Sequence, residues 1–263
     1  MSLFRDPWWA DLKAYYGTPP NVALDLGTRY KGRRPVFPAS KTCPDPPRGK
    51  TLDEIWAAVP RDTPEAKEQF WRDVGPWFSF RQVVRNRLRS FRFIAETEPM
   101  SFLEWGAGVC PVTYWFLRRS KNPPLRIVVA DVESEHFQFG LWRFRHAAPA
   151  VGSVVRGVIL SHMDPLPLCG ERFHAAAILE TLEHVPNPLA TIRHIGEHVR
   201  RGGWLFEDFR PHGPGDEGAP WDLPEAQVER PEVYRYLEKE FDLVAGRHYD
   251  EPDGGGTRTW RKR

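Results

Sequence analysis

The stretch Phe102-Leu-Glu-Trp-Gly-Ala-Gly-Val-Cys-Pro111 decides the fold of this chain. An apolar strand ends at the acid Glu104, Gly106 and Gly108 follow, and Pro111 suits the first turn of a helix, where its missing N–H is not needed. At the carboxyl end of a parallel strand, such a loop offers bare backbone N–H groups and a carboxylate to a ligand. Pro111 takes the place of the third glycine of the dinucleotide-binding motif G-x-G-x-x-G, so that motif is not matched. The Gly-Lys-Ser/Thr of a P-loop does not follow either. A tight structural turn is the alternative interpretation of this stretch alone.

Further apolar runs, separated by segments of helical length, follow this loop. The runs rich in β-branched residues that we expect to be strands are 125–130, 153–160, 175–179 and 204–208. A helix over 189–200 is expected to end at Gly202 and Gly203. This alternation predicts a doubly wound, mostly parallel sheet. Asp131 stands at the tip of the second strand, where a ribose diol is usually held, and Glu133 is the alternative for that role.

The end of the chain predicts one more helix and a hairpin. The helix is expected over 231–240, and the two strands over 241–249 and 257–261. The run Asp253-Gly-Gly-Gly256 between these strands is typical of a turn.

Four motifs in order resemble the class I S-adenosylmethionine-dependent methyltransferases over residues 101–208. More narrowly, they are similar to the small-molecule branch that includes the ubiquinone and menaquinone biosynthesis methyltransferases. The motifs are the acid-x-Gly-x-Gly loop, the strand tip at Asp131, the Leu-Pro-Leu…Arg-Phe-His approach to strand four, and Leu-Glu-His-Val-Pro-Asn-Pro followed by Arg-Arg-Gly-Gly-Trp-Leu. The chain departs from the family at Cys110, where glycine is common, and at His174, where an acid is common.

The resemblance implies a Rossmann-like, doubly wound, seven-stranded, mostly parallel sheet with a terminal antiparallel hairpin. It also implies S-adenosylmethionine as cofactor and transfer of its methyl group to an O, N or C atom of a small metabolite. The cofactor contacts that it implies are Glu104 to the methionine ammonium, Gly106 and Gly108 through their backbone, Asp131 or Glu133 to the ribose, His162, Met163 and Asp164 to adenine, and Glu180 beside the methyl group.

The run Glu180-x-x-Glu183-His184 leaves two interpretations open. The two carboxylates and the imidazole have a spacing that could hold a divalent metal ion, with His212 as a fourth ligand. Without a metal, His184 or His212 is the expected general base, because histidine titrates near neutral pH, and Glu180 joins them as a catalytic candidate. We favour the base.

Residues 1–97 differ in composition from residues 98–263, the expected cofactor-binding domain. They are rich in Trp, Phe, Pro and Arg and are expected to form a helical lid and substrate-binding extension, including a long amphipathic helix over 75–96. Arginines on one face of that helix are typical of a solvated surface, or of a site for an anion. With the aromatic residues near the start of the chain, they suggest an acceptor that is anionic or aromatic.

Composition narrows the class of protein. The chain has 263 residues, a net charge of +2 and three cysteines. So small a net charge does not indicate nucleic-acid binding. The odd number of cysteines predicts free thiols in the cytoplasm. No apolar run approaches the roughly 18 residues that a membrane span needs. Three alternatives to methylation of a small metabolite remain: other sulfonium chemistry such as cyclisation or elimination, metal-assisted methylation of an RNA end, and a non-catalytic cofactor-binding scaffold.

Overall fold

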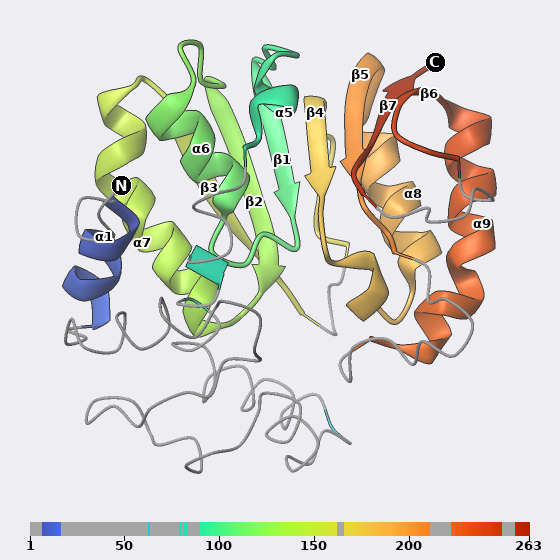
Figure 1. Cartoon of the computed structure of the whole chain (residues 1–263), viewed down its shortest axis with the longest axis horizontal. Coiled ribbons are helices and arrows are strands. Elements are labelled where there is room, and N and C mark those ends of the chain that lie inside the picture. Colours follow the sequence, from blue (N-terminus) through green and yellow to red (C-terminus); the bar gives the residue numbers. More distant parts are fainter. Residues whose placement is uncertain are drawn as a thin grey trace.

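The computed structural model describes residues 7–16, 63, 79, 82–83, 90–161, 166–210, 222–248 and 256–263. Its centre is a seven-stranded sheet in the order β3-β2-β1-β4-β5-β7-β6 (Figure 1). The strands are β1 Ser101–Trp105, β2 Arg126–Val132, β3 Val154–Leu160, β4 Phe173–Ile178, β5 Val199–Glu207, β6 Phe241–Ala245 and β7 Arg258–Lys262. Strands β1 to β5 pair in parallel, and β7 runs antiparallel between β5 and β6. The predicted fold class is confirmed.

Helices cover both faces of this sheet (Figure 1). Successive residues of the central strands point to opposite faces, so Phe102 of β1 belongs to one hydrophobic core and Leu103 to another. The first core also receives side chains from α6 and α7, and the second from α8 and α9. The helices are α1 Pro7–Tyr16, α5 Arg92–Ala95, α6 Pro111–Arg119, α7 Glu135–Ala150, the 3₁₀ turn η2 Leu182–His184, α8 Pro188–His198 and α9 Pro224–Glu240.

Residues from the expected lid segment pack into the first core. Leu12, Val83 and Phe91 are buried with Phe102 of β1. Arg143 of α7, whose guanidinium lies 3.8 Å from the ring centre of Tyr114, also lies within 3.8 Å of Asp11 of α1. Hydrophobic contact and charge therefore both attach α1 to α7.

Three expected element boundaries are corrected by the structure. Ser90 and Phe91 are not helical, so the helix expected over 75–96 is not continuous, and α5 begins only at Arg92. Helix α8 ends at His198, and Gly202 lies inside β5 with a φ of +70° instead of ending the helix. Helix α9 begins at Pro224, seven residues earlier than expected, and Pro231 lies within it.

A buried ion pair joins β5 to β7. The carboxylate of Glu207 lies 3.4 Å from the guanidinium of Arg258, and both side chains are almost wholly buried. The indole N–H of Trp260 donates to Glu207 at 3.0 Å, and the Phe209 amide donates to its other oxygen at 2.8 Å. The carboxylate is therefore supported by three separate donors inside the sheet.

In the described part of the chain, no helix is long and apolar enough to cross a membrane.

Candidate functional site

The loop between β1 and α6 requires glycine at two positions. Gly106 has a φ of +63°, and a Cβ there would lie 2.2 Å from the Thr181 side chain. Gly108 has a φ of +51°, and a Cβ there would lie 2.4 Å from Oε1 of Gln82. Both the left-handed backbone and the close neighbours exclude larger residues. Cys110, at the position where the family often has glycine, also has a positive φ, +54°.

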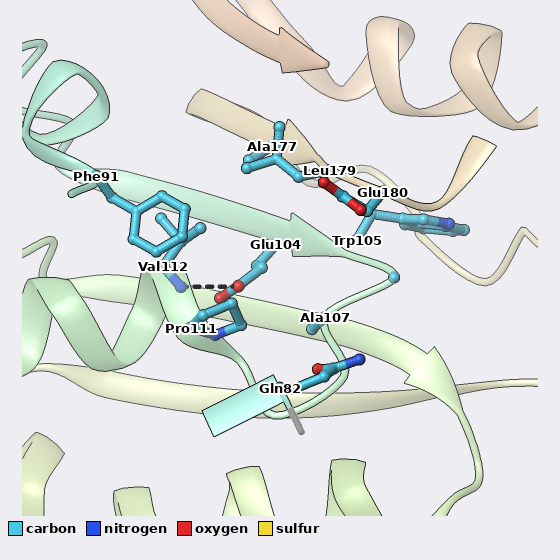
Figure 2. A pocket seen from close by; sticks show the side chains of 11 residues that line it. Gln82, Phe91, Glu104, Trp105, Ala107, Pro111, Val112, Ala177, Leu179 and Glu180 are labelled. Carbon is cyan, nitrogen blue, oxygen red and sulfur yellow. Dashed lines mark hydrogen bonds between the residues drawn. The ribbon is translucent and has the colours of Figure 1, made fainter. Parts of the chain in front are cut away.

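Glu104 lies beneath this loop at the carboxyl end of β1, as expected. Its two oxygens accept hydrogen bonds from the amides of Val112 at 3.0 Å and Thr113 at 2.8 Å. Figure 2 shows the bond from Val112. The carboxylate thereby binds two of the amides that the first turn of α6 leaves without an intrahelical partner. Burial raises the pKa of Glu104 to about 7, although these hydrogen bonds act in the opposite direction. Near neutral pH the group is poised between its two charge states.

Asp131 connects the tip of β2 to the glycine loop. Its Oδ2 accepts from the Gly108 amide at 2.5 Å and its Oδ1 from the Val132 amide at 2.7 Å. Burial raises the pKa of Asp131 to about 6. The neighbouring Glu133, the alternative ribose ligand, is exposed. Ser134 follows as the N-cap of α7 and accepts a hydrogen bond from the Phe137 amide.

A pocket opens beside the glycine loop, between the ends of β1 and β4 (Figure 2). Two of its lining residues, Gln82 and Phe91, come from the segment before residue 98. Oε1 of Gln82 also accepts a hydrogen bond from the Val109 amide at 3.2 Å. The remaining lining residues come from β1, the loop, α6 and the end of β4: Glu104, Trp105, Gly106, Ala107, Pro111, Val112, Ala177, Leu179 and Glu180.

Glu180 lines the pocket and has a strained backbone conformation, with a φ of +53°. Its amide donates to Oδ1 of Asp208 at 2.5 Å, and Arg210 donates to its Oε1 at 2.7 Å. Sequence reasoning did not select Asp208 or Arg210. The signal was available, because Asp208 ends the fifth predicted strand at the same edge of the sheet.

Glu183 and His184 lie in η2, a short distance along the same edge. Glu183 is 6 % exposed, and burial raises its pKa to about 7. Its Oε2 has no hydrogen-bond partner among the described residues. Nδ1 of His184 lies 3.1 Å from Oδ1 of Asp222, which sequence reasoning also missed. Leu223, beside Asp222, donates its amide to the Glu183 carbonyl at 2.8 Å, so the start of α9 is held against η2.

Four predicted site residues lie outside the described residues: His162, Met163, Asp164 and His212. Within the described ranges, no three His, Cys, Asp or Glu side chains are grouped so that they could hold a metal ion. The alternative of a metal bound by Glu180, Glu183, His184 and His212 depends on a residue beyond these ranges and stays a hypothesis.

The chain is similar to several solved structures. No protein-family model matches the chain, and the curated proteins give no match. Solved structures with a similar fold include an O-methyltransferase from Bacillus cereus in complex with SAH, at 14 % identity and a TM-score of 0.49, covering 74 % of this chain and 99 % of that one. Another is the O-methyltransferase TomG from Streptomyces achromogenes in complex with SAM. It is 16 % identical with a TM-score of 0.48, and the match covers 74 % of this chain and 98 % of that one. A third is the N-methyltransferase NodS from Bradyrhizobium japonicum. It is 15 % identical with a TM-score of 0.43, and the match covers 62 % of this chain and 85 % of that one. The strand order, with the glycine loop after β1 and the antiparallel pair at the end of the chain, gives a Rossmann-like, doubly wound fold.

Proposed function

We propose that this chain transfers the methyl group of S-adenosylmethionine to an O, N or C atom of a small metabolite. One observation carries the proposal: a glycine loop, Glu104 and Asp131 meet at the carboxyl ends of β1 and β2, beside a pocket. This edge of a parallel sheet is where ligands of open α/β folds bind.

The residues present fit this cofactor. Asp131 offers a carboxylate for the ribose hydroxyls, and the glycine loop lets a ligand approach the main chain. Glu104 lines the pocket and, when ionised, is suited to an ammonium group directly or through water. The cofactor supplies a methyl group on a cationic sulfur, which needs alignment with the acceptor within roughly 3–3.5 Å and a dry surrounding. The protein's task is to position both partners.

We further propose that residues 1–97 act as a lid on residues 98–263. Gln82 bonds to the glycine loop and, together with Phe91, lines the pocket, which supports this assignment. A segment in this position would help to exclude water from the reacting groups.

The acceptor was predicted to be anionic or aromatic, and the described residues give more support to an aromatic acceptor than to an anionic one. Phe91 and Trp105 line the pocket and could pack against an aromatic ring. The anionic character was inferred from an arginine stripe of which only Arg92 is described, and Arg92 is exposed and pairs with Glu96 at 2.7 Å. The cytoplasmic location stays a prediction; Cys110 and Cys169 form no disulfide with another described residue, and Cys43 lies outside the described residues.

Product analysis tests the proposed reaction. The full chain is incubated with S-adenosylmethionine and a panel of small acceptors, and the products are separated by chromatography. Formation of S-adenosylhomocysteine with a methylated acceptor is the expected result. Methylthioadenosine would instead indicate cyclisation or elimination at the sulfonium, and failure to bind the cofactor at all would overturn the proposal.

A further inference from the structure

Gln82 brings a side-chain amide to the pocket from the segment before residue 98. It lines the pocket together with Glu104. Figure 2 shows its side chain beside the glycine loop. A Cβ on Gly108 would lie 2.4 Å from Oε1 of Gln82 and 3.1 Å from Nε2, so the amide packs against the bare main chain of that glycine. The space that a side chain on Gly108 would fill is thus occupied by this amide.

The orientation of the Gln82 amide follows from its hydrogen bond to the loop. The backbone N–H of Val109 donates to Oε1 at 3.2 Å. Because a backbone N–H needs an acceptor, this bond assigns the oxygen to the loop and leaves Nε2 as the other end of the amide. Among the described residues, Nε2 has no hydrogen-bond acceptor. Its two N–H groups are therefore open to a ligand of the pocket that Gln82 lines.

The surroundings of Gln82 indicate which ligand group suits these donors. Glu104, the proposed partner of the cofactor's ammonium, lines the same pocket. The amino-acid end of S-adenosylmethionine carries an ammonium and a carboxylate on one carbon atom, so a site for the first lies next to a site for the second. A carboxylate has two acceptor oxygens for the N–H groups of Gln82. The bond from Val109 polarises the amide, and the amino end of α6, at Pro111, adds a positive potential nearby.

We propose that Nε2 of Gln82 donates to the carboxylate at the amino-acid end of S-adenosylmethionine. This inference rests on the proposed function and adds to it a binding residue outside residues 98–263. The cofactor then contacts both parts of the chain, because Gln82 belongs to the lid segment and Glu104 to the sheet. The amino-acid end of the cofactor thereby ties the lid to the pocket, and a ligand without that end does not.

Calorimetry on the full chain, with ligands that differ at the amino-acid end, tests the assignment. Decarboxylated S-adenosylmethionine keeps the ammonium and the sulfonium and lacks only the carboxylate, whereas methylthioadenosine lacks the whole amino-acid end. We expect the wild-type chain to bind S-adenosylmethionine at least ~3-fold more tightly than its decarboxylated form, because a hydrogen bond to a charged group is lost. Equal or tighter binding of the decarboxylated form overturns the assignment.

Two variants assign the effect to the amide of Gln82. Gln82→Ala should weaken S-adenosylhomocysteine by ~3-fold or more and leave methylthioadenosine unchanged, because only the first ligand has the carboxylate. Gln82→Glu keeps the size but places an acid beside the ligand's carboxylate, so it should bind decarboxylated S-adenosylmethionine better than S-adenosylmethionine. Gln138→Glu, at a glutamine of α7, is the matched control and should keep the wild-type order. A wild-type order in Gln82→Glu overturns the role of Gln82.

The same measurements separate this inference from the proposed function. Should Gln82→Ala weaken methylthioadenosine and S-adenosylhomocysteine equally, Gln82 acts by shaping the loop, and its bond to the carboxylate is wrong while cofactor binding stands. Should neither S-adenosylmethionine nor S-adenosylhomocysteine bind to the wild-type chain, the proposed function falls, and this inference falls with it.

Discussion

The carboxylate of Asp131 accepts a hydrogen bond from the amide of Gly108 at 2.5 Å, which fixes the tip of β2 to the loop that follows β1. Two residues that lie 23 positions apart in the sequence thereby form one polar contact at the edge of the sheet. The same carboxylate is the proposed ligand of the ribose hydroxyls, so the residue that shapes the loop would also bind the ligand.

Replacement of Asp131 should therefore weaken cofactor binding. We expect Asp131→Ala to reduce the affinity for both S-adenosylmethionine and S-adenosylhomocysteine by ~10-fold or more, measured by calorimetry, because charged hydrogen bonds are lost. Glu133→Ala is the matched control, since Glu133 is exposed. If Glu133→Ala weakens cofactor binding and Asp131→Ala does not, Glu133 and not Asp131 binds the ribose.

Glu104 predicts how stability depends on pH. Its pKa is about 7 in the folded protein, against an ordinary value of 4.5 for a solvated glutamate, so the folded state holds the proton to higher pH. The free energy of unfolding should then fall as the pH rises from about 4.5 to 7, by up to roughly 3 kcal/mol from this group. Asp131 and Glu183, whose pKa values are also raised, act with the same sign.

Urea denaturation of the cofactor-free protein across that pH range measures this slope. Glu104→Gln should flatten it in part, because the amide does not titrate, and the remaining slope should come from the other buried carboxyls. A slope of equal size in wild type and Glu104→Gln would mean that the pKa of Glu104 is not raised.

Gln82 offers a test of the lid that avoids truncation. Removal of residues 1–97 would also remove Leu12, Val83 and Phe91 from the hydrophobic core, so loss of folding would obscure the result. Gln82→Ala removes the hydrogen bond from the Val109 amide, and we expect ~3-fold or greater loss of affinity for S-adenosylhomocysteine with little change in the unfolding midpoint. Gln138→Ala, on α7, is the control. Unchanged affinity in Gln82→Ala would argue against contact between the lid and the cofactor.

The backbone of Glu180 predicts a difference between two substitutions. Glu180→Gly and Glu180→Ala both lose the hydrogen bond from Arg210, but only glycine adopts a φ of +53° without strain. We expect the glycine variant to be more stable than the alanine variant by about 1 kcal/mol in urea denaturation. Equal stabilities would show that the backbone relaxes when the side chain is removed.

Elemental analysis decides between the two interpretations of His184. We expect no stoichiometric divalent ion in the purified protein and no effect of chelation on the affinity for S-adenosylhomocysteine. In that case His184, beside Asp222, remains available as a base. A stoichiometric ion that is lost from Glu183→Gln and His184→Ala would establish the metal alternative and would exclude the base.

The strands and the glycine loop could be predicted from sequence because local signals agree there. The runs 125–130 and 153–160 are β-branched and apolar, and they match β2 and β3 to within two residues at each end. The positive φ values of Gly106 and Gly108 agree with the close approach that the motif implies.

The boundaries and partners that were missed depend on tertiary contacts. Phe91 falls on the periodic stripe of a long helix, but it is buried in the core just before α5 begins, which interrupts that helix. Pro231 looked like a helix start, whereas Pro224 occupies that position and the later proline lies within the helix. The bonds of Asp208 and Arg210 to Glu180 join residues about 30 positions apart, and no local pattern records them.

The position of β7 has a consequence for how the protein is made. β7 follows β6 in the chain but lies between β5 and β6 in the sheet, and its residues Arg258 and Trp260 cover the carboxylate of Glu207. Until those residues leave the ribosome, β5 presents an open edge that ends in an uncompensated acid, and such edges invite pairing with other chains. A chain that is cut short before Arg258 therefore leaves β5 without its antiparallel neighbour and the Glu207 carboxylate without its guanidinium and indole donors.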